Sequence, residues 1–348
     1  MTTGEEFVFG LTAAILAGLF SYGMCRAFIS MRVGLDPVSE RSNHTAPTPR
    51  LGGFAVLIGI GGAAVFLFAT DLLARDMLNL LLIMFGGGLI GLLDDLIEPP
   101  TWAKFLMMIA LAVAAAVFLG PVKSVPLPFL GWVPLPLLLG QALAAFWVLS
   151  IINVLNFMDG LNGLAGTFAI VVFGAASMVW MEPSWPLLAA QIAVLGFLFC
   201  NVFEGKIFLG DAGSLSIGTL MGAAPLLAGD SGPQFWIVPL VCLPLILDVG
   251  VTLMRRAIRG ARLYEPHREH LYQQLKAAGW SHQASSGAVV LTGAAGAVIA
   301  CSLWPLASQE PLVYWLCALL IGLIWAATMR ALLILKPSQS FPLEGAFR

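Results

Sequence analysis

Charged side chains are scarce in this sequence. Asp, Glu, Lys and Arg make up only 10% of the 348 residues, whereas 59% are hydrophobic and the mean hydropathy is +0.92. This composition excludes a soluble globular protein and is typical of chains with many membrane spans. The formal net charge is only −2 and there is no basic stripe, so nucleic acid is excluded as a partner.

Metal-ligand spacing and disulfide patterns are also missing. The five cysteines lie in or at the ends of apolar stretches, where we expect them to pack in the interior: Cys25, Cys200, Cys242, Cys301 and Cys317. There is no internal repeat, low-complexity tract or separate soluble segment, so residues 1–348 are predicted to form a single membrane domain. Glu5 and Glu6, rather than a basic segment, precede the first apolar stretch, which we expect to remain as a span.

About eleven hydrophobic stretches of roughly 18 residues run along the chain. They cover residues 7–28, 51–70, 77–93, 102–120, 135–153, 163–181, 186–203, 213–229, 234–254, 286–305 and 312–333. We therefore predict an all-α polytopic membrane protein with about 10–11 transmembrane helices.

The distribution of basic residues predicts the orientation, because Lys and Arg are retained on the cytoplasmic side. An outward N-terminus places 15 of the 17 on inner loops and their flanks: Arg26, Arg32, Arg41, Arg50, Lys104, Lys206, Arg255, Arg256, Arg259, Arg262, Arg268, Lys276, Arg330, Lys336 and Arg348. Nearly all side chains that could bind a ligand or take part in catalysis fall on this same side, so we expect an active site that faces the cytoplasm.

Two adjacent carboxylates, Asp94 and Asp95, end the apolar run LNLLLIMFGGGLIGLLDDLIEPP. Carboxylates are unfavourable at a helix C-terminus and at a membrane boundary, so the pair requires a cationic partner. A metal, a phosphate–metal complex or a transported cation would meet this requirement.

Two further polar clusters follow apolar stretches. In NVLNFMDGLNGLAG, the residues Asn156, Asp159 and Asn162 recur at three-residue steps on one helical face or turn, where they can hold a sugar, a nucleobase edge or a hydrated metal. Asp211 in FLGDAGS lies between glycines and before an apolar run. It is either the N-cap of the next helix or a ligand at that helix terminus, and the sequence does not separate the two.

Two inner loops carry candidate phosphate contacts. His44 and Arg50 lie in DPVSERSNHTAPTPRLGG, whose glycines permit close backbone approach, although an ordinary basic loop is the alternative. His267, Arg268 and His270 are predicted to start a short amphipathic helix that suits a diphosphate, or a basic segment against anionic lipid. Asp248, in an apolar stretch, needs a partner and is interpreted as structural.

The ordered motifs HTAPTPRLGG, GLLDDL, NVLNFMDGLNGLAG, FLGDAGS and EPHREH resemble the polyprenyl-phosphate N-acetylhexosamine-1-phosphate transferase family, glycosyltransferase family 4. The resemblance covers about residues 36–275. It implies transfer of a sugar 1-phosphate from a UDP-sugar donor to undecaprenyl phosphate, with release of UMP and a requirement for Mg²⁺ or Mn²⁺. It also implies a bacterial inner-membrane enzyme in contact with membrane lipids, with a homodimer as one open form of assembly.

The resemblance assigns roles by position. Asp94 and Asp95 are similar to the family's catalytic carboxylates, and Asp211, with Asp159, to its metal ligands. Asn156 and Asp159 match positions near the nucleotide and metal, and His267, Arg268 and His270 match the loop that contacts the donor. By this resemblance Asp159, His267 and His270 are also predicted to be catalytic. Asn162 departs from the pattern, because many relatives have aspartate there, and the amide keeps a hydrogen bond but loses a charge.

The segment EPHREHLYQQL is similar to the O-antigen-initiating subgroup, so we expect an N-acetylhexosamine or its 6-deoxy relative. A phospho-N-acetylmuramoyl-pentapeptide transferase is the alternative within the family. An ion-coupled transporter is the alternative from another class, although it would favour carboxylates near the bilayer midplane.

Overall fold

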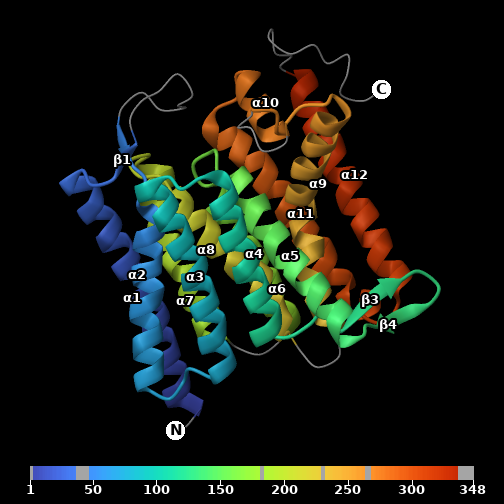
Figure 1. The fold of residues 1–348 in the computed structure, drawn as a ribbon, viewed down its shortest axis with the longest axis horizontal. Helices are drawn as coiled ribbons and strands as arrows, with labels where there is room; N and C mark the ends of the chain where they lie inside the picture. Colours follow the sequence, from blue (N-terminus) through green and yellow to red (C-terminus); the bar gives the residue numbers. More distant parts are fainter. Residues whose placement is uncertain (1–2, 37–46, 181–183, 229–231, 263–267, 336–348) are drawn as a thin grey trace.

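The computed structural model describes residues 3–36, 47–180, 184–228, 232–262 and 268–335 (Figure 1). The α-helices are α1 Thr3–Met31, α2 Gly52–Ala69, α3 Arg75–Ile97, α4 Thr101–Phe118, α5 Leu137–Met158, α6 Leu164–Trp180, α7 Trp185–Leu198, α8 Gly210–Ala223, α9 Ile237–Ile258, α10 Leu271–Ala277, α11 His282–Ala307 and α12 Pro311–Leu335. The strands are β1 Leu35–Asp36, β2 Thr48–Pro49, β3 Ser124–Leu127 and β4 Gly131–Pro134, which form two antiparallel pairs. A π-helical turn, Phe199–Phe203, extends α7, and short 3₁₀ turns cover Ala224–Leu227 and Pro233–Trp236.

Each of the eleven apolar stretches forms a helix, which confirms the all-α polytopic fold. Within the described ranges, nine helices are long and apolar enough to cross a membrane. Of the others, α6 has 17 residues and α8 has 14, so both are shorter than the predicted spans. A 14-residue helix rises about 21 Å, less than the hydrocarbon thickness, and α8 compensates by lying inside the bundle.

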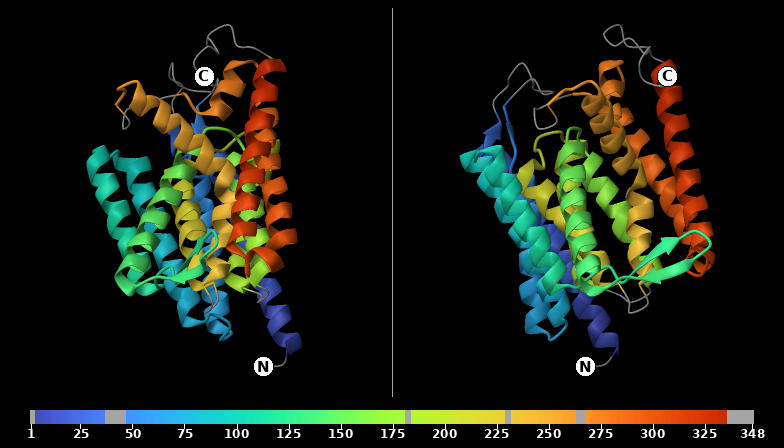
Figure 2. Two further views of the ribbon diagram at one scale, coloured as in Figure 1. Left: turned by 90° about the vertical axis from the view of Figure 1, so that its right-hand side faces the viewer. Right: turned by 45° about the vertical axis from the view of Figure 1, so that its right-hand side comes forward.

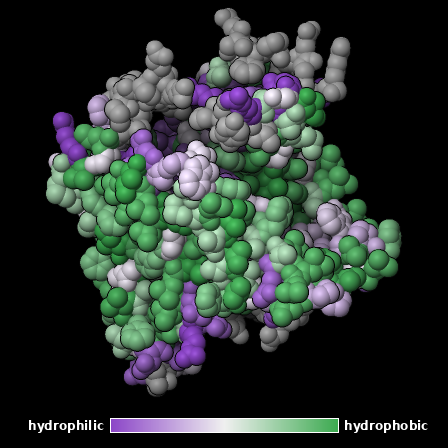
Figure 3. Space-filling model, in the orientation of Figure 1, coloured by the Kyte–Doolittle hydropathy of each residue, from purple (hydrophilic) through white to green (hydrophobic). Residues whose placement is uncertain are grey.

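The helices run between two ends of the bundle that differ in structure. The chain starts at one end with α1, and α12 finishes at the other (Figure 1). The β1–β2 pair and α10 lie at the end where α12 finishes, whereas the β3–β4 hairpin lies at the opposite end (Figures 1 and 2). Hydrophobic surface covers the middle of the molecule, and hydrophilic side chains gather toward the two ends (Figure 3). This banding is expected of a multi-pass membrane protein.

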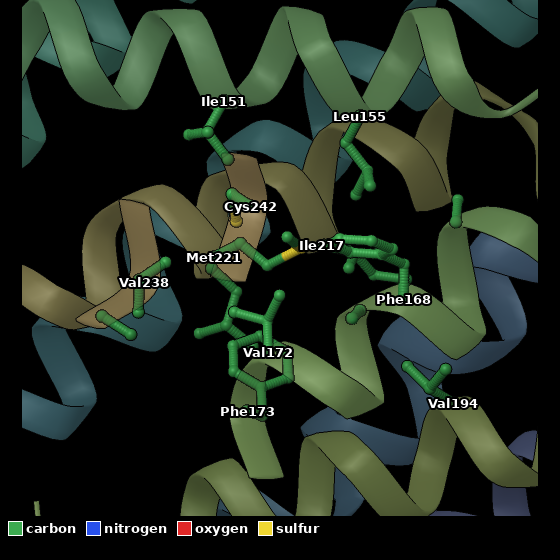
Figure 4. Close-up of a cluster of buried hydrophobic side chains, with 14 of the residues drawn as sticks. Ile151, Leu155, Phe168, Val172, Phe173, Val194, Ile217, Met221, Val238 and Cys242 are labelled. Carbon is green, nitrogen blue, oxygen red and sulfur yellow. The ribbon is translucent and has the colours of Figure 1, made fainter. Parts of the chain in front are cut away.

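The core is organised around α8. Every residue of α8 from Ala212 to Ala223 is buried. Ile217 and Met221 of this helix lie among buried side chains of four other helices (Figure 4), which are Ile151 and Leu155 of α5, Phe168, Val172 and Phe173 of α6, Val194 of α7, and Val238 and Cys242 of α9. The position of α8 from Ala212 onward is therefore fixed by packing on all sides.

Glycines allow three segments to touch through their backbones at the start of α8. The amide of Gly53 donates to the carbonyl of Leu209 at 2.7 Å, and a Cβ on Gly53 would lie 2.0 Å from the nitrogen of Gly213. A Cβ on Gly91 of α3 would lie 2.1 Å from the carbonyl oxygen of Asp211. The close backbone approach expected at the glycines after Arg50 is therefore made to α8.

Replacing Gly91 with alanine is expected to destabilise the protein, because the new methyl group must displace the backbone at Asp211. Overpacking of this kind costs about 1–3 kcal/mol, which thermal unfolding in detergent will report as a lower melting temperature. Gly174→Ala in α6 is the matched control, since a Cβ there meets nothing within 4 Å. Equal melting temperatures for the two variants would contradict the close contact between α3 and α8.

Candidate active site

Three charged side chains meet where α3, α4 and α8 come together. Nζ of Lys104 lies 2.9 Å from Oδ2 of Asp94 and also donates a hydrogen bond to Oδ2 of Asp211. The side chains of Lys104, Asp94 and Asp211 are 16%, 24% and 28% exposed, so the group is partly shielded from water but open on one side. Lys104 is thus a cationic partner for the acidic pair, and it holds two carboxylates from different helices at one point.

Asp95 has a different environment from its neighbour. Its Oδ1 accepts a hydrogen bond from the amide of Asp211 at 3.2 Å, and its Oδ2 accepts one from the amide of Ala212 at 3.0 Å. Those amides belong to the first turn of α8, which has no intrahelical acceptor for them. Asp95 therefore caps α8 from another helix. Of the two alternatives for Asp211, N-cap or ligand, the structure rules out the N-cap, because Asp211 lies inside the first turn.

Arg50 joins the end of β2 to the end of α3. Its Nε lies 3.5 Å from Oδ1 of Asp95, and its guanidinium donates to the backbone carbonyl of Asp95 at 2.7 Å. The side chain of Asp95 is only 4% exposed, so this cation and the two amides of α8 compensate a buried carboxylate. A phosphate contact for Arg50 stays a prediction, since the contacts described here are to Asp95 and, at 3.8 Å, to Glu98.

Asn156, near the end of α5, completes the surroundings of Asp211. Its Nδ2 donates to Oδ1 of Asp211 at 3.0 Å and to the hydroxyl oxygen of the buried Ser214 at 2.9 Å. The two oxygens of Asp211 therefore face different donors, Lys104 and Asn156. This arrangement fixes the orientation of the carboxylate before any ligand arrives.

Asp159 is the C-cap of α5 and lies outside the membrane-spanning helices. Burial, followed by the negative charges of Asp211 and Asp95, raises the pKa of the Asp159 carboxyl well above its usual range. A bound cation would reverse part of this effect. Of the two arrangements predicted for Asn156, Asp159 and Asn162, one helical face or a turn, the helical face is wrong, because α5 ends at Met158 and residues 159–163 form a turn.

The turn after α5 is held by a residue that the sequence reasoning did not identify. Asn201, which is 3% exposed in the π-helical turn, accepts a hydrogen bond from the amide of Gly163 at 2.7 Å and donates to the carbonyl of Ile207 at 2.8 Å. One side chain therefore joins the loop that contains Asn162 to the loop that leads into α8. Asn162 itself contributes its backbone carbonyl to Ser286 of α11 at 3.0 Å.

The predicted histidine helix begins later than expected. His270 is the N-cap of α10 and is 2% exposed, and its ring stacks with Phe157 and with Tyr272 at centroid distances of 6.0 and 5.9 Å. Arg268 is exposed. His44 and His267 lie outside the described residues. The structure therefore places His270 against the end of α5 without a described contact to Asp94 or Asp211.

Lys104 had a recognisable signal in the sequence. Only Glu98–Pro100 separates α3 from α4, and a short helix–helix connection makes the two helices antiparallel neighbours. Asp94 and Lys104 lie at similar distances from that connection and so come side by side. Asn201 and Ser214 carried no such signal, because Gly163 and Asn156, which they contact, lie 38 and 58 residues away in the chain.

The oxygen donors suit a small divalent cation in kind. Asp94 and Asp211 each direct a carboxylate oxygen toward the same point. The Lys104 ammonium lies there and donates to both oxygens. In the described part of the chain, no three His, Cys, Asp or Glu side chains are arranged to hold a metal ion. Mg²⁺ typically takes one or two protein carboxylates and completes its shell with substrate phosphates and water, so the Asp94 and Asp211 carboxylates are of a suitable kind for it.

The fold and the site define a multi-pass membrane protein with a cluster of acidic, amide and lysine side chains at one end. Residues 77–229, which include Asp94, Asn156 and Asp211, match the model of glycosyl transferase family 4. The chain is 32% identical over 316 residues to the decaprenyl-phosphate N-acetylglucosaminephosphotransferase of Mycolicibacterium smegmatis, covering 80% of this chain and 77% of the relative. The chain belongs to the polyprenyl-phosphate N-acetylhexosamine-1-phosphate transferase family.

Two other relatives show the range of this family. The probable undecaprenyl-phosphate N-acetylglucosaminyl 1-phosphate transferase of Bacillus subtilis is 27% identical over 285 residues, which cover 76% of each chain. The phospho-N-acetylmuramoyl-pentapeptide-transferase of Halalkalibacterium halodurans is 29% identical over 258 residues, covering 67% of this chain and 76% of the relative. The relatives thus include proteins named for two different transferred groups.

The different contacts of the two adjacent aspartates predict different effects of their amides. Asp95→Asn removes a charged cap from α8 and a partner from Arg50, so we expect the free energy of unfolding to fall by about 1–2 kcal/mol. Asp94→Asn keeps an oxygen acceptor for Lys104 and relieves repulsion with Asp211, so its effect on unfolding is expected to stay within about 0.5 kcal/mol. Thermal unfolding of the two variants makes the comparison, each serving as control for the other. Equal destabilisation would contradict the separate roles.

Proposed function

We propose that the protein transfers an N-acetylhexosamine 1-phosphate from a UDP-sugar to undecaprenyl phosphate and releases UMP. The observation that carries this proposal is the convergence of Asp94, Lys104 and Asp211 beside Asn156, in a chain of this family. A centre with both acidic and basic groups suits a diphosphate held together with a divalent ion. The names of the relatives, which specify polyprenyl phosphates and N-acetylglucosamine, support the same reaction.

The reaction exchanges one phosphorus–oxygen bond for another. A bond forms between an oxygen of the lipid phosphate and the β-phosphorus of the donor, and the bond from that phosphorus to the UMP oxygen breaks. UMP leaves with the electron pair, and no oxidant or other co-reactant is needed. The lipid diphosphate sugar and UMP therefore account for all atoms.

The side chains at the centre have separable tasks in this proposal. Asp94 and Asp211 would hold Mg²⁺ or Mn²⁺ together with donor phosphates, and Asn156 fixes the orientation of Asp211. When bound, the ion would offset phosphate charge and make UMP a better leaving group. Lys104 is then free to interact with a phosphate oxygen.

Orientation follows from the basic residues of the described helices. Arg26, Lys104 and Arg256 lie near the end that carries the acidic centre, whereas Arg75 lies at the start of α3, at the other end. By the retention of positive charge on the inner side, the centre faces the cytoplasm of a bacterial inner membrane. UDP-sugars are made in that compartment, and membrane lipids surround the helices.

The transferred sugar and the pathway are narrower questions. An N-acetylhexosamine agrees with the names of the mycobacterial and Bacillus relatives, and a 6-deoxy form and an O-antigen pathway stay predictions from EPHREHLYQQL. Transfer of phospho-N-acetylmuramoyl-pentapeptide is the second candidate, because the Halalkalibacterium relative carries that name. The transporter alternative rested on acidic residues within apolar helices. Membership of the transferase family accounts for these residues without it.

Transfer of radiolabel from a panel of UDP-N-acetyl sugars to undecaprenyl phosphate tests the proposal with purified protein in detergent. We expect labelled lipid and stoichiometric UMP with Mg²⁺, no product after chelation, and turnover reduced by orders of magnitude in Asp211→Asn because a carboxylate ligand of the metal is lost. The variant's melting temperature serves as the folding control. Label from UDP-N-acetylmuramoyl-pentapeptide alone would select the second candidate, and no product with any donor would refute the transferase.

A further inference from the structure

A buried carboxylate in α9 takes no part in the acidic centre. Asp248 is 1% exposed, and its two oxygens accept hydrogen bonds from the amides of Leu271 at 2.9 Å and Tyr272 at 3.3 Å. These amides open α10 and have no acceptor within that helix. Burying a carboxylate in a membrane protein is costly unless it is compensated. The two amides at the start of α10 compensate Asp248 and link α9 to α10.

The same carboxylate faces the imidazole of His270. Oδ1 of Asp248 lies 3.4 Å from Nδ1 of His270, whose side chain is 3% exposed. The ring stacks with Phe157 and with Tyr272, at interplanar angles of 28° and 13°. A carboxylate close to one ring nitrogen, with two aromatic rings nearby at small interplanar angles, restricts the orientation of an imidazole.

The start of α10 is also fastened to the turn that carries Asp159. The hydroxyl of Tyr272 donates to the carbonyl of Phe157 at 3.0 Å, and a Cβ on Gly160 would come within 2.3 Å of that hydroxyl oxygen. Phe157 and Gly160 flank Asp159 in the chain. A shift of α10 would therefore move the turn on which Asp159 sits.

A second contact from α9 holds the segment on its other side. Arg256 donates to Oε1 of Glu269 at 2.5 Å, and Arg259 donates to the other carboxylate oxygen. Burial alone would raise the pKa of Glu269, but the hydrogen bonds and charges of Arg259 and Arg256 outweigh it and lower that pKa. Arg256 and Arg259 therefore hold the start of segment 269–272, and Asp248 of the same helix holds its end.

We infer that Asp248 is a positioning residue for the reaction: it orients the His270 ring and locks the start of α10 against the turn that carries Asp159. The inference rests on the proposed function for its kinetic consequence, whereas its structural part concerns the folded protein alone. Asp248 acts through His270 and the α10 backbone and touches no substrate. It extends the site from the acidic centre into α9.

Selective ¹⁵N labelling of histidine tests the structural part, because the chain has only four histidines. His270→Gln assigns the resonances of His270. Asp248→Asn keeps the side-chain size but loses the charge beside Nδ1, so the ring ¹⁵N shifts of His270 are expected to move. Asp71→Asn is the matched control, since Asp71 is exposed at the opposite end, with a φ of 55° that asparagine tolerates.

The kinetic part uses the transfer assay. We expect Asp248→Asn to lower kcat by roughly 10- to 100-fold, as the loss of an orienting partner does, with KM for the lipid acceptor unchanged and Asp71→Asn at the wild-type rate. Tyr272→Phe, which removes only the hydroxyl contact to Phe157, is expected to lower kcat in the same direction. If Asp248→Asn does not fold, Tyr272→Phe tests the inference instead. A wild-type kcat in Tyr272→Phe would then overturn it.

The two proposals fail in different ways. Unchanged ¹⁵N shifts of His270 in folded Asp248→Asn overturn the positioning role, whatever the activity. A wild-type protein that transfers nothing from any donor overturns the proposed function, and the ¹⁵N shifts then decide the structural part by themselves.

Discussion

The first turn of α8 is the constraint on which the rest of the site depends. Helix α8 begins inside a bundle of other helices, so its leading amides cannot be left to bulk water and need acceptors from the protein. Asp95 supplies these acceptors from the end of α3. The contact requires backbones to touch at Gly53 and Gly91, and it places Asp211 next to Asp94 and Lys104. The acidic centre is thus a consequence of how one buried helix is capped.

The helices were predictable because the bilayer imposes a local rule that composition records. Each apolar stretch of the sequence forms a helix, since a backbone in hydrocarbon must satisfy its own hydrogen bonds. The need of Asp94 and Asp95 for compensation was also predictable, because it follows from charge and position alone. The structure identifies Lys104 as one partner, and the convergence of Asp94, Asn156 and Asp211 agrees with the grouping implied by the motifs.

The other features of the site depend on contacts between segments that are distant in the sequence. Local sequence patterns hold no information on such contacts. The division of labour between Asp94 and Asp95 is set by which helix each side chain faces. The clamp made by Asn201 joins two loops that follow different helices. The partners of Asp248 are the amides of Leu271 and Tyr272, which lie 23 and 24 residues further along the chain.

The central claim is that Asp94 and Asp211 hold the divalent ion of the reaction. Anomalous diffraction from crystals grown with Mn²⁺ and the UDP-sugar donor tests this claim most directly, because the signal locates the ion without assumptions about activity. The account predicts a single strong peak within coordination distance of carboxylate oxygens of both Asp94 and Asp211. A peak bound elsewhere, with the contacts of Lys104 to both carboxylates intact, would contradict it.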